Sequence, residues 1–95
     1  MEQLDGRVAV ITGGASGIGL AMAKAFAVEG MRLVLADIEE GTLDAAIGEL
    51  PAGTDVEAVR CDVSDGVQVD ALRDAAIDRF GAVHVVCNNA GVSTG

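Results

Sequence analysis

The sequence is poor in aromatic and basic residues. Tryptophan and tyrosine are absent, and Phe26 and Phe80 are the only phenylalanines among 95 residues. A hydrophobic core must therefore consist mainly of aliphatic side chains, for which a hydrophobic content of 51% provides enough material. Lysine and arginine together number 6 against 15 acidic residues, and the net charge is −9. Binding to a nucleic-acid backbone requires clustered basic residues, so nucleic acid is excluded as a partner.

Long hydrophobic runs, a signal peptide and paired cysteines are also missing. No stretch of about 18 apolar residues is present, and residues 1–5 lack the basic and apolar regions of a secretory leader. We therefore expect a soluble, cytoplasmic protein with no membrane contact. Cys61 and Cys87 stand alone, without the Cys-x-x-Cys spacing of metal or redox sites. In a cytoplasmic chain they are predicted to be buried free thiols, and no metal site is predicted.

A glycine-rich stretch, residues 12–19, carries the main functional signal. Its sequence, Thr-Gly-Gly-Ala-Ser-Gly-Ile-Gly, follows the apolar run 8–11 and precedes a helical pattern. The glycines permit positive φ angles and close approach of the backbone. A helix that begins near Gly17 directs free N–H groups and its positive dipole end toward the turn, which suits a diphosphate. The alternative is an ordinary glycine-rich turn, whereas a P-loop is excluded because Leu20 stands where that motif requires lysine.

Four apolar runs alternate with three helical patterns. Strands are predicted at 7–12, 32–37, 55–61 and 83–87, and helices from near Gly17 to a C-cap at Gly30, at 42–50, and from an N-cap at Ser64 to about Phe80. This order predicts one α/β domain over residues 1–95, with a parallel sheet and right-handed crossovers. The sheet-covering face of the first helix is predicted to comprise Ile18, Ala21, Met22, Ala25 and Phe26.

Asp37 ends the second predicted strand, at the edge of the sheet where open α/β folds bind ligands. It lies 18 residues beyond Gly19, close to the spacing of about 20 at which an acidic residue accepts hydrogen bonds from the adenosine ribose of a dinucleotide. A carboxylate there repels a 2′-phosphate, and neither Ser16 nor Ile38 supplies a compensating positive charge. The sequence therefore favours NAD over NADP. The alternative is a solvated aspartate that starts the turn 37–41.

Residues 12–19, together with Asn88-Asn89-Ala90-Gly91, resemble the short-chain dehydrogenase/reductase family. The resemblance covers nearly the whole chain but only the first part of the family pattern. It implies a Rossmann-type doubly wound parallel sheet, truncated here to four strands in the order 3-2-1-4 and three helices.

The same resemblance implies roles for individual residues. Asp62 would contact the adenine amino group, with Val63 packed nearby, although Asp62 could instead only cap the turn before the third helix. The backbone N–H of Ile18 would meet the pyrophosphate, and the backbone of residues 88–91 would lie along the cofactor ribose. The predicted cofactor-binding residues are Gly13, Ser16, Gly17, Ile18, Gly19, Asp37, Asp62, Val63, Asn89, Ala90 and Gly91.

The activity implied by the resemblance is NAD-dependent hydride transfer between a secondary alcohol and a ketone. In the family a serine and a Tyr-x-x-x-Lys motif assist that step, and both lie beyond the segment that resembles 88–91. The chain contains no tyrosine, its single lysine is Lys24, and Ser93 is too close to that segment. No catalytic residue is therefore assigned, and the 95-residue chain alone is predicted to be inactive. The alternatives are an inert nucleotide-binding module or truncated remnant, and another Rossmann-type enzyme such as a methyltransferase.

The predicted strand order leaves the sheet unevenly covered. One helix alone would cover the second face, and the strand 83–87 would form an open edge containing Val83, Val85 and Val86. We therefore expect the chain alone to self-associate or to fold poorly. His84, within this apolar strand, is predicted to be a partly buried structural residue rather than a catalytic one.

Overall fold

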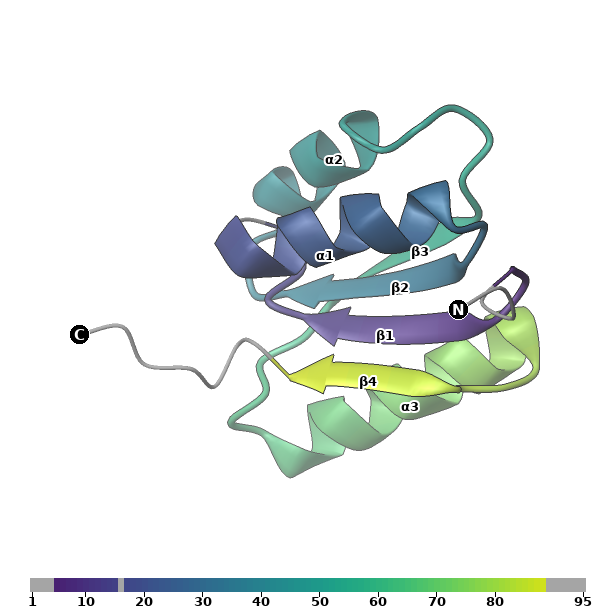
Figure 1. Cartoon of the computed structure of the whole chain (residues 1–95). Helices are drawn as coiled ribbons and strands as arrows, with labels where there is room; N and C mark the ends of the chain where they lie inside the picture. The colour runs from purple at the N-terminus through teal and green to yellow at the C-terminus, as the bar shows by residue number, and fades with distance from the viewer. Residues whose placement is uncertain (1–4, 16, 89–95) are drawn as a thin grey trace.

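The computed structural model describes residues 5–15 and 17–88, with Asn88 described by its backbone alone. Seven elements follow one another in the chain (Figure 1). They are β1 (Val8–Thr12), α1 (Gly17–Val28), β2 (Arg32–Asp37), α2 (Glu40–Gly48), β3 (Val56–Arg60), α3 (Gly66–Phe80) and β4 (Val85–Asn88).

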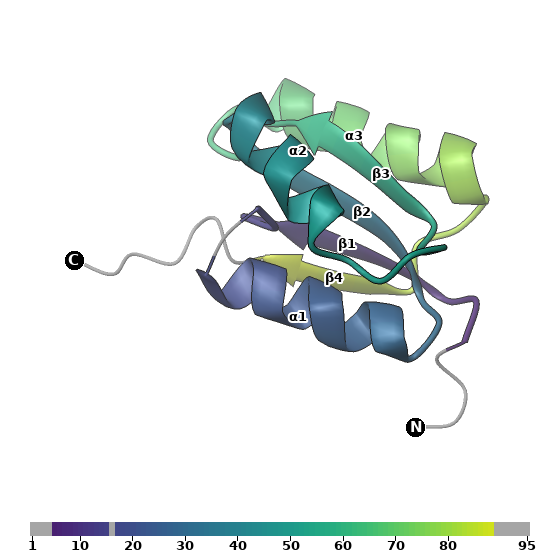
Figure 2. The same ribbon diagram turned by 90° about the horizontal axis from the view of Figure 1, so that it is seen from above.

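The strands form one parallel sheet in the order β3-β2-β1-β4. Helices α1 and α2 cover one face, and α3 lies on the opposite face (Figure 1, Figure 2). Right-handed crossovers produce this division, because the chain moves in one direction from β1 to β3 and in the reverse direction from β3 to β4. The predicted fold class, a Rossmann-type doubly wound sheet of four strands and three helices, is confirmed.

The interior residues of the central strands β1 and β2 are apolar because both faces of these strands are buried. Ile11, Leu33 and Leu35 belong to the core beneath α1 and α2. The alternating neighbours Val10 and Val34 belong to a second core beneath α3. Continuous apolar runs of this kind are typical of parallel strands that are covered on both sides.

The predicted sheet-covering face of α1 is wrong in part. Ile18, Ala21 and Ala25 are exposed, whereas Gly19 and Ala23 are buried. Met22 and Phe26, which were predicted correctly, pack against the core together with Leu20 and Ala27. The helix is therefore rotated from the predicted orientation, because its small residues allow α1 to approach the glycine turn and the sheet closely.

Three element boundaries in the structure also differ from the predicted ones. Helix α3 is capped by Asp65, whose side chain accepts a hydrogen bond from the Val67 N–H at 3.0 Å, and not by Ser64. Helix α2 begins at Glu40, two residues before the predicted start, and β4 begins at Val85. The C-cap at Gly30 is supported, because Gly30 has a φ of 82° and its N–H donates to the Ala27 carbonyl.

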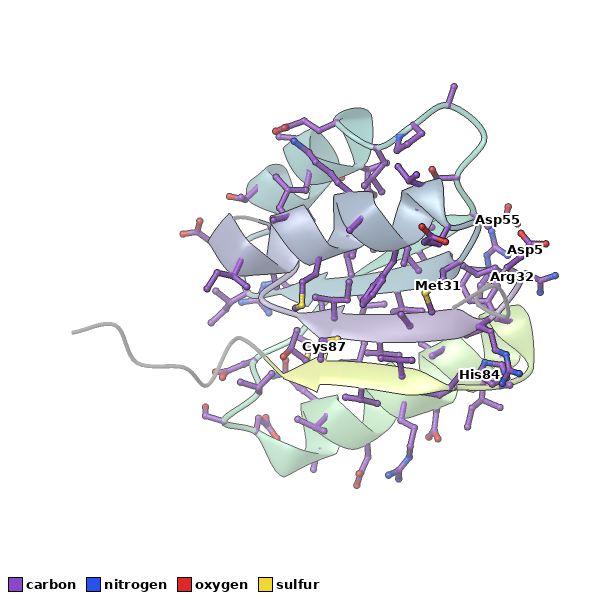
Figure 3. All side chains as sticks on the ribbon, viewed as in Figure 1. Asp5, Met31, Arg32, Asp55, His84 and Cys87 are labelled. Carbon is purple, nitrogen blue, oxygen red and sulfur yellow. The ribbon has the colours of Figure 1, made fainter. Side chains whose placement is uncertain are left out.

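His84 joins β4 to β1 at the amino ends of these strands (Figure 3). Its Nδ1 accepts a hydrogen bond from the Val8 N–H at 2.9 Å, and its own N–H donates to the Val8 carbonyl at 2.9 Å. The side chain is exposed, which corrects the expectation of partial burial. Its contacts nevertheless have the structural character that was predicted.

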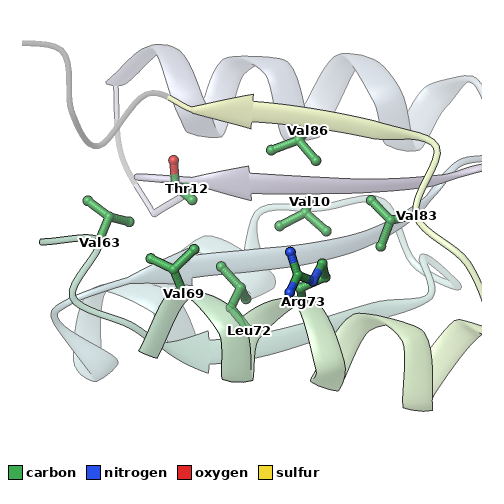
Figure 4. A pocket seen from close by; sticks show the side chains of 8 residues that line it. All are labelled: Val10, Thr12, Val63, Val69, Leu72, Arg73, Val83 and Val86. Carbon is green, nitrogen blue, oxygen red and sulfur yellow. The ribbon is translucent and has the colours of Figure 1, made fainter. Parts of the chain in front are cut away.

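The face that α3 covers is partly open, and β4 is an edge strand as predicted. A groove of about 330 Å³ runs between α3 and the strands β1 and β4. Figure 4 shows the side chains that line it: Val10, Thr12, Val63, Val69, Leu72, Arg73, Val83 and Val86. Val86 is 64% exposed on this face.

Both cysteines are free thiols, as predicted, with Cys61 buried and Cys87 half-buried. Burial raises the pKa of each thiol above its ordinary value, so both are protonated at neutral pH. None of the helices within residues 5–15 and 17–88 is long and apolar enough to cross a bilayer.

Candidate functional site

The site lies at the carboxyl edge of the sheet, where the four strands end and α1 begins (Figure 1). The turn between β1 and α1 has the backbone that its glycines suggest. Gly13 and Gly17 have φ angles of 66° and 59°, a region that other residues rarely adopt. The Gly14 N–H donates to the Ala36 carbonyl at 3.1 Å and holds the turn against the end of β2.

Gly19 allows the first turn of α1 to lie directly on the glycine turn. It is buried, and a Cβ atom at this position would overlap the carbonyl oxygen of Gly13. The first turn of α1 contains no acidic side chain. Its N–H groups and the positive end of its dipole are therefore not neutralised locally, as an anion site requires.

A cavity of about 240 Å³ opens beside the glycine turn. Its walls come from the ends of β1, β2 and β3, which are far apart in the sequence. The lining residues are Gly13, Asp37, Ile38, Cys61, Asp62 and Val63. The structure thus brings four of the predicted cofactor-binding residues, Gly13, Asp37, Asp62 and Val63, to one cavity.

Asp37 is held by two backbone groups. Its Oδ1 accepts from the Ile38 N–H at 2.8 Å, and its Oδ2 accepts from the Ala15 N–H at 3.3 Å. The second bond connects the end of β2 to the glycine turn. The carboxylate is therefore oriented before any ligand arrives, and each oxygen retains further acceptor capacity.

Asp62 is held by Ser64. Its Oδ1 accepts from the Ser64 hydroxyl at 2.7 Å and from the Ser64 N–H at 3.0 Å. These bonds, with the hydroxyl as the larger cause, lower the pKa of Asp62 below its ordinary 3.8, and the charge of Arg60 adds to the effect. The carboxylate is ionised at neutral pH. It closes the turn before α3, and that role leaves its Oδ2 available to a ligand.

Several predicted residues lie outside this cavity. The Ile18 side chain is 69% exposed on the first turn of α1, and Gly17 and Gly19 belong to the adjoining glycine turn and helix start. Ser16, Asn89, Ala90 and Gly91 lie outside the described residues. The Thr12 hydroxyl donates to the Cys87 carbonyl at 3.3 Å, and Cys87 lies at the end of β4 (Figure 3).

Two residues that line the cavity were not predicted to do so. Ile38 is 49% exposed, and Cys61 forms part of the buried wall. Both directly follow a strand, so their position at the carboxyl edge was the available signal. Their apolar side chains gave no chemical reason to select them.

The charge in the cavity is negative. Asp37 and Asp62 line it, whereas lysine and arginine are absent from those lining residues that the structure describes. Such a cavity suits a ligand that presents neutral hydrogen-bond donors, such as hydroxyl and amino groups. It disfavours a phosphate in contact with either carboxylate.

A parallel sheet in this order, with a glycine turn leading into α1, defines a Rossmann-type protein. The comparison with protein families gives the narrower class: the model described as "short chain dehydrogenase" matches residues 7–95. The chain belongs to this family of oxidoreductases.

Two relatives indicate the range of the family. The chain is 51% identical over 87 residues to 1-deoxy-11-beta-hydroxypentalenate dehydrogenase from Streptomyces arenae, an alignment that covers 90% of this chain and 31% of the relative. It is 39% identical over 94 residues to (+)-borneol dehydrogenase 1 from Salvia officinalis, an alignment that covers 99% of this chain and 35% of the relative. The chain therefore spans about a third of the length of these relatives.

Solved structures agree with this assignment. A short-chain dehydrogenase/reductase from Burkholderia phymatum, crystallised in complex with NAD, superposes on this chain with a TM-score of 0.86 at 53% sequence identity. The superposition covers 90% of this chain and 31% of the chain from Burkholderia phymatum. A hydroxysteroid dehydrogenase from Escherichia coli gives a TM-score of 0.88 at 37% sequence identity. This superposition covers 96% of this chain and 39% of the chain from Escherichia coli.

Proposed function

We propose that this chain is the dinucleotide-binding part of an NAD(H)-dependent oxidoreductase that transfers hydride between a secondary alcohol and a ketone. The observation that carries the proposal is the cavity at the carboxyl edge, which joins Gly13 of the glycine turn to the carboxylates of Asp37 and Asp62. A relative of this family with 53% identity was solved with NAD.

The residues fit the adenosine half of NAD. In this proposal the ribose hydroxyls donate to Asp37 and the adenine amino group donates to Asp62, since carboxylate oxygens accept hydrogen bonds from such donors. Ile38 and Val63 supply apolar surface for the base. The diphosphate lies at the amino end of α1, where Gly17, Ile18 and Gly19 present backbone N–H groups.

The preference for NAD over NADP rests on charge. A 2′-phosphate would lie against the Asp37 carboxylate in a cavity whose lining contains no cation. When bound, the nicotinamide supplies or accepts the hydride. The residues of this chain bind and orient the dinucleotide, and none of them is assigned to the proton transfer. The substrate is proposed as an alcohol or ketone because the two relatives are named as dehydrogenases of 1-deoxy-11-beta-hydroxypentalenate and of (+)-borneol.

Cofactor titration tests the proposal. The sequence lacks tryptophan and tyrosine, so the fluorescence of NADH or NADPH can be followed against a low protein background. We expect the wild-type chain to bind NADH more tightly than NADPH. The double variant Asp37→Ala, Ile38→Arg should bind NADH about tenfold or more weakly, because charged hydrogen bonds contribute about 1.5–3 kcal/mol. The same variant should gain affinity for NADPH.

Asp74→Arg provides the matched control. Asp74 is an exposed carboxylate on α3, away from the cavity, and its replacement by arginine changes the net charge by the same amount as the double variant. We expect this control to leave the preference unchanged. A double variant that folds and retains the wild-type ratio of NADH to NADPH affinity would contradict the assignment of Asp37. An absence of binding to either dinucleotide would contradict the proposed function.

A further inference from the structure

Asp62 is the carboxylate of the cavity that depends on a neighbouring side chain for its orientation. Its Oδ1 accepts both the hydroxyl and the backbone N–H of Ser64, so this oxygen is fully engaged. Oδ2 is then the oxygen that remains for a ligand in the cavity. The distance of 2.7 Å between Ser64 Oγ and Asp62 Oδ1 is typical of a charge-assisted bond, which is about twice as strong as a neutral one.

The backbone of Asp62 is fixed as well. Its N–H donates to Gln68 Oε1 at 2.9 Å, and Gln68 Nε2 donates to Asp65 Oδ2 at 3.3 Å. Asp65 in turn caps α3 through the Val67 N–H. The turn that carries Asp62 is therefore attached to the first turn of α3, and the rotation of the carboxylate about its side-chain bonds is the freedom that Ser64 removes.

We propose that Ser64 is a positioning residue for adenine recognition: it holds Asp62 Oδ1 so that Oδ2 accepts the hydrogen bond of the adenine amino group. This inference rests on the proposed function, because it requires a dinucleotide in the cavity. Ser64 does not line the cavity and acts through Asp62. Its contribution is to keep the acceptor oriented, which reduces the ordering cost of binding.

Adenine presents an amino donor at the position where hypoxanthine presents a carbonyl oxygen. A fixed Asp62 carboxylate accepts from the first base and is repelled by the second. An Asp62 carboxylate that rotates freely and is hydrated should discriminate less, although it remains charged. Loss of Ser64 is therefore expected to change the choice between the two bases more than the overall affinity.

The test compares NADH with the reduced dinucleotide that contains hypoxanthine in place of adenine, each titrated by nicotinamide fluorescence. We expect the wild-type chain to prefer NADH by about tenfold, the value of one hydrogen bond to a charged group. Ser64→Ala should reduce this ratio at least threefold. Ser64→Thr, which keeps a hydroxyl at this position, should retain the wild-type ratio. Thr54→Ala is the matched control, because it removes a hydroxyl bonded at 2.7 Å to the Pro51 carbonyl, in the turn before β3.

The outcomes separate the two proposals. If the wild-type chain binds neither dinucleotide, the proposed function fails. If it binds both equally well, Asp62 does not recognise the amino group and the inference fails. A purely structural role for Ser64 would weaken both ligands by the same factor and leave their ratio unchanged. A folded Ser64→Ala variant that retains the wild-type ratio would therefore overturn the positioning role, and circular dichroism establishes that each variant is folded.

Discussion

Gly19 and Gly13 lie in contact where the glycine turn meets α1. A side chain at Gly19 would overlap the Gly13 carbonyl, and that neighbour is backbone, which cannot rotate away. Gly41, on α2, has open space around the position of a Cβ atom and no positive φ. The same substitution should therefore have opposite effects at the two positions.

We predict that Gly19→Ala destabilises the chain by about 1–3 kcal/mol, the usual cost of overpacking, and abolishes NADH binding. Gly41→Ala should stabilise the chain by about 0.4–1 kcal/mol, since alanine lowers the conformational entropy of the unfolded chain at a position whose backbone it can adopt. Urea unfolding followed by circular dichroism measures both effects. Equal stability changes in the two variants would show that the turn does not depend on close approach at Gly19.

For individual residues, the sequence predicted where a side chain lies in the fold better than it predicted that side chain's hydrogen-bond partners. Asp37 and Asp62 were placed correctly at the carboxyl edge because each follows an apolar run, and parallel strands end at a common edge. The bonds from Ala15 to Asp37 and from Ser64 to Asp62 were not predicted. Such bonds depend on local rotations of the turn, which residue spacing does not specify.

Between elements, β1 and β4 are joined by an unusual bond. The Val8 N–H, in a residue that is 1% exposed, donates to an imidazole nitrogen of His84 rather than to a carbonyl oxygen. Removal of the imidazole leaves this donor without its acceptor. The ion pair between Lys24 and Glu49, which connects α1 to the end of α2 at 2.8 Å, is by contrast about half exposed on both sides.

We predict that His84→Ala lowers the free energy of unfolding by about 1–3 kcal/mol, the cost of an unsatisfied buried donor. Lys24→Ala should lower it by less than about 1 kcal/mol, because exposed ion pairs contribute little. Chemical unfolding at neutral pH measures the free energy of unfolding of both variants. If His84→Ala is no more destabilising than Lys24→Ala, the bond to Val8 does not stabilise the β1–β4 pair.

The elements themselves were predicted more reliably than their contacts. All seven appear in the expected order because apolar runs and helical periods are local signals. The buried face of α1 was misassigned because the small residues Gly19 and Ala23, and not the larger Ile18, are the buried residues of this helix. The cap of α3 was assigned to Ser64 rather than Asp65, since adjacent capping residues are equally suitable by type and only the backbone decides between them.

At the scale of the whole molecule, the two faces of the sheet are covered unequally. Four of the exposed large hydrophobic residues, Val67, Val69, Ile77 and Val86, belong to α3 or β4. Val69 and Val86 also line the groove on this face (Figure 4). An edge strand beside exposed apolar side chains is a site where protein chains pair with one another.

We propose that the 95-residue chain self-associates through this edge. Val86→Lys should weaken association by roughly tenfold or more, because a buried unpaired charge is costly. Val28→Lys, at another exposed valine on α1, is the control and should have no comparable effect. The net charge of −9 opposes association, so added salt should strengthen it. A monodisperse wild-type monomer in sedimentation velocity experiments would contradict this proposal.

The central claim is that NAD binds at the carboxyl edge of the sheet, and an NMR titration of the ¹⁵N-labelled chain tests it most directly. Addition of NAD is predicted to shift the amide signals of Gly13, Ala15, Ile38, Asp62 and Val63 most strongly. The signals of Asp55 and His84, at the opposite edge, should move little. Shifts concentrated at that opposite edge, or no shifts at millimolar NAD, would contradict the account.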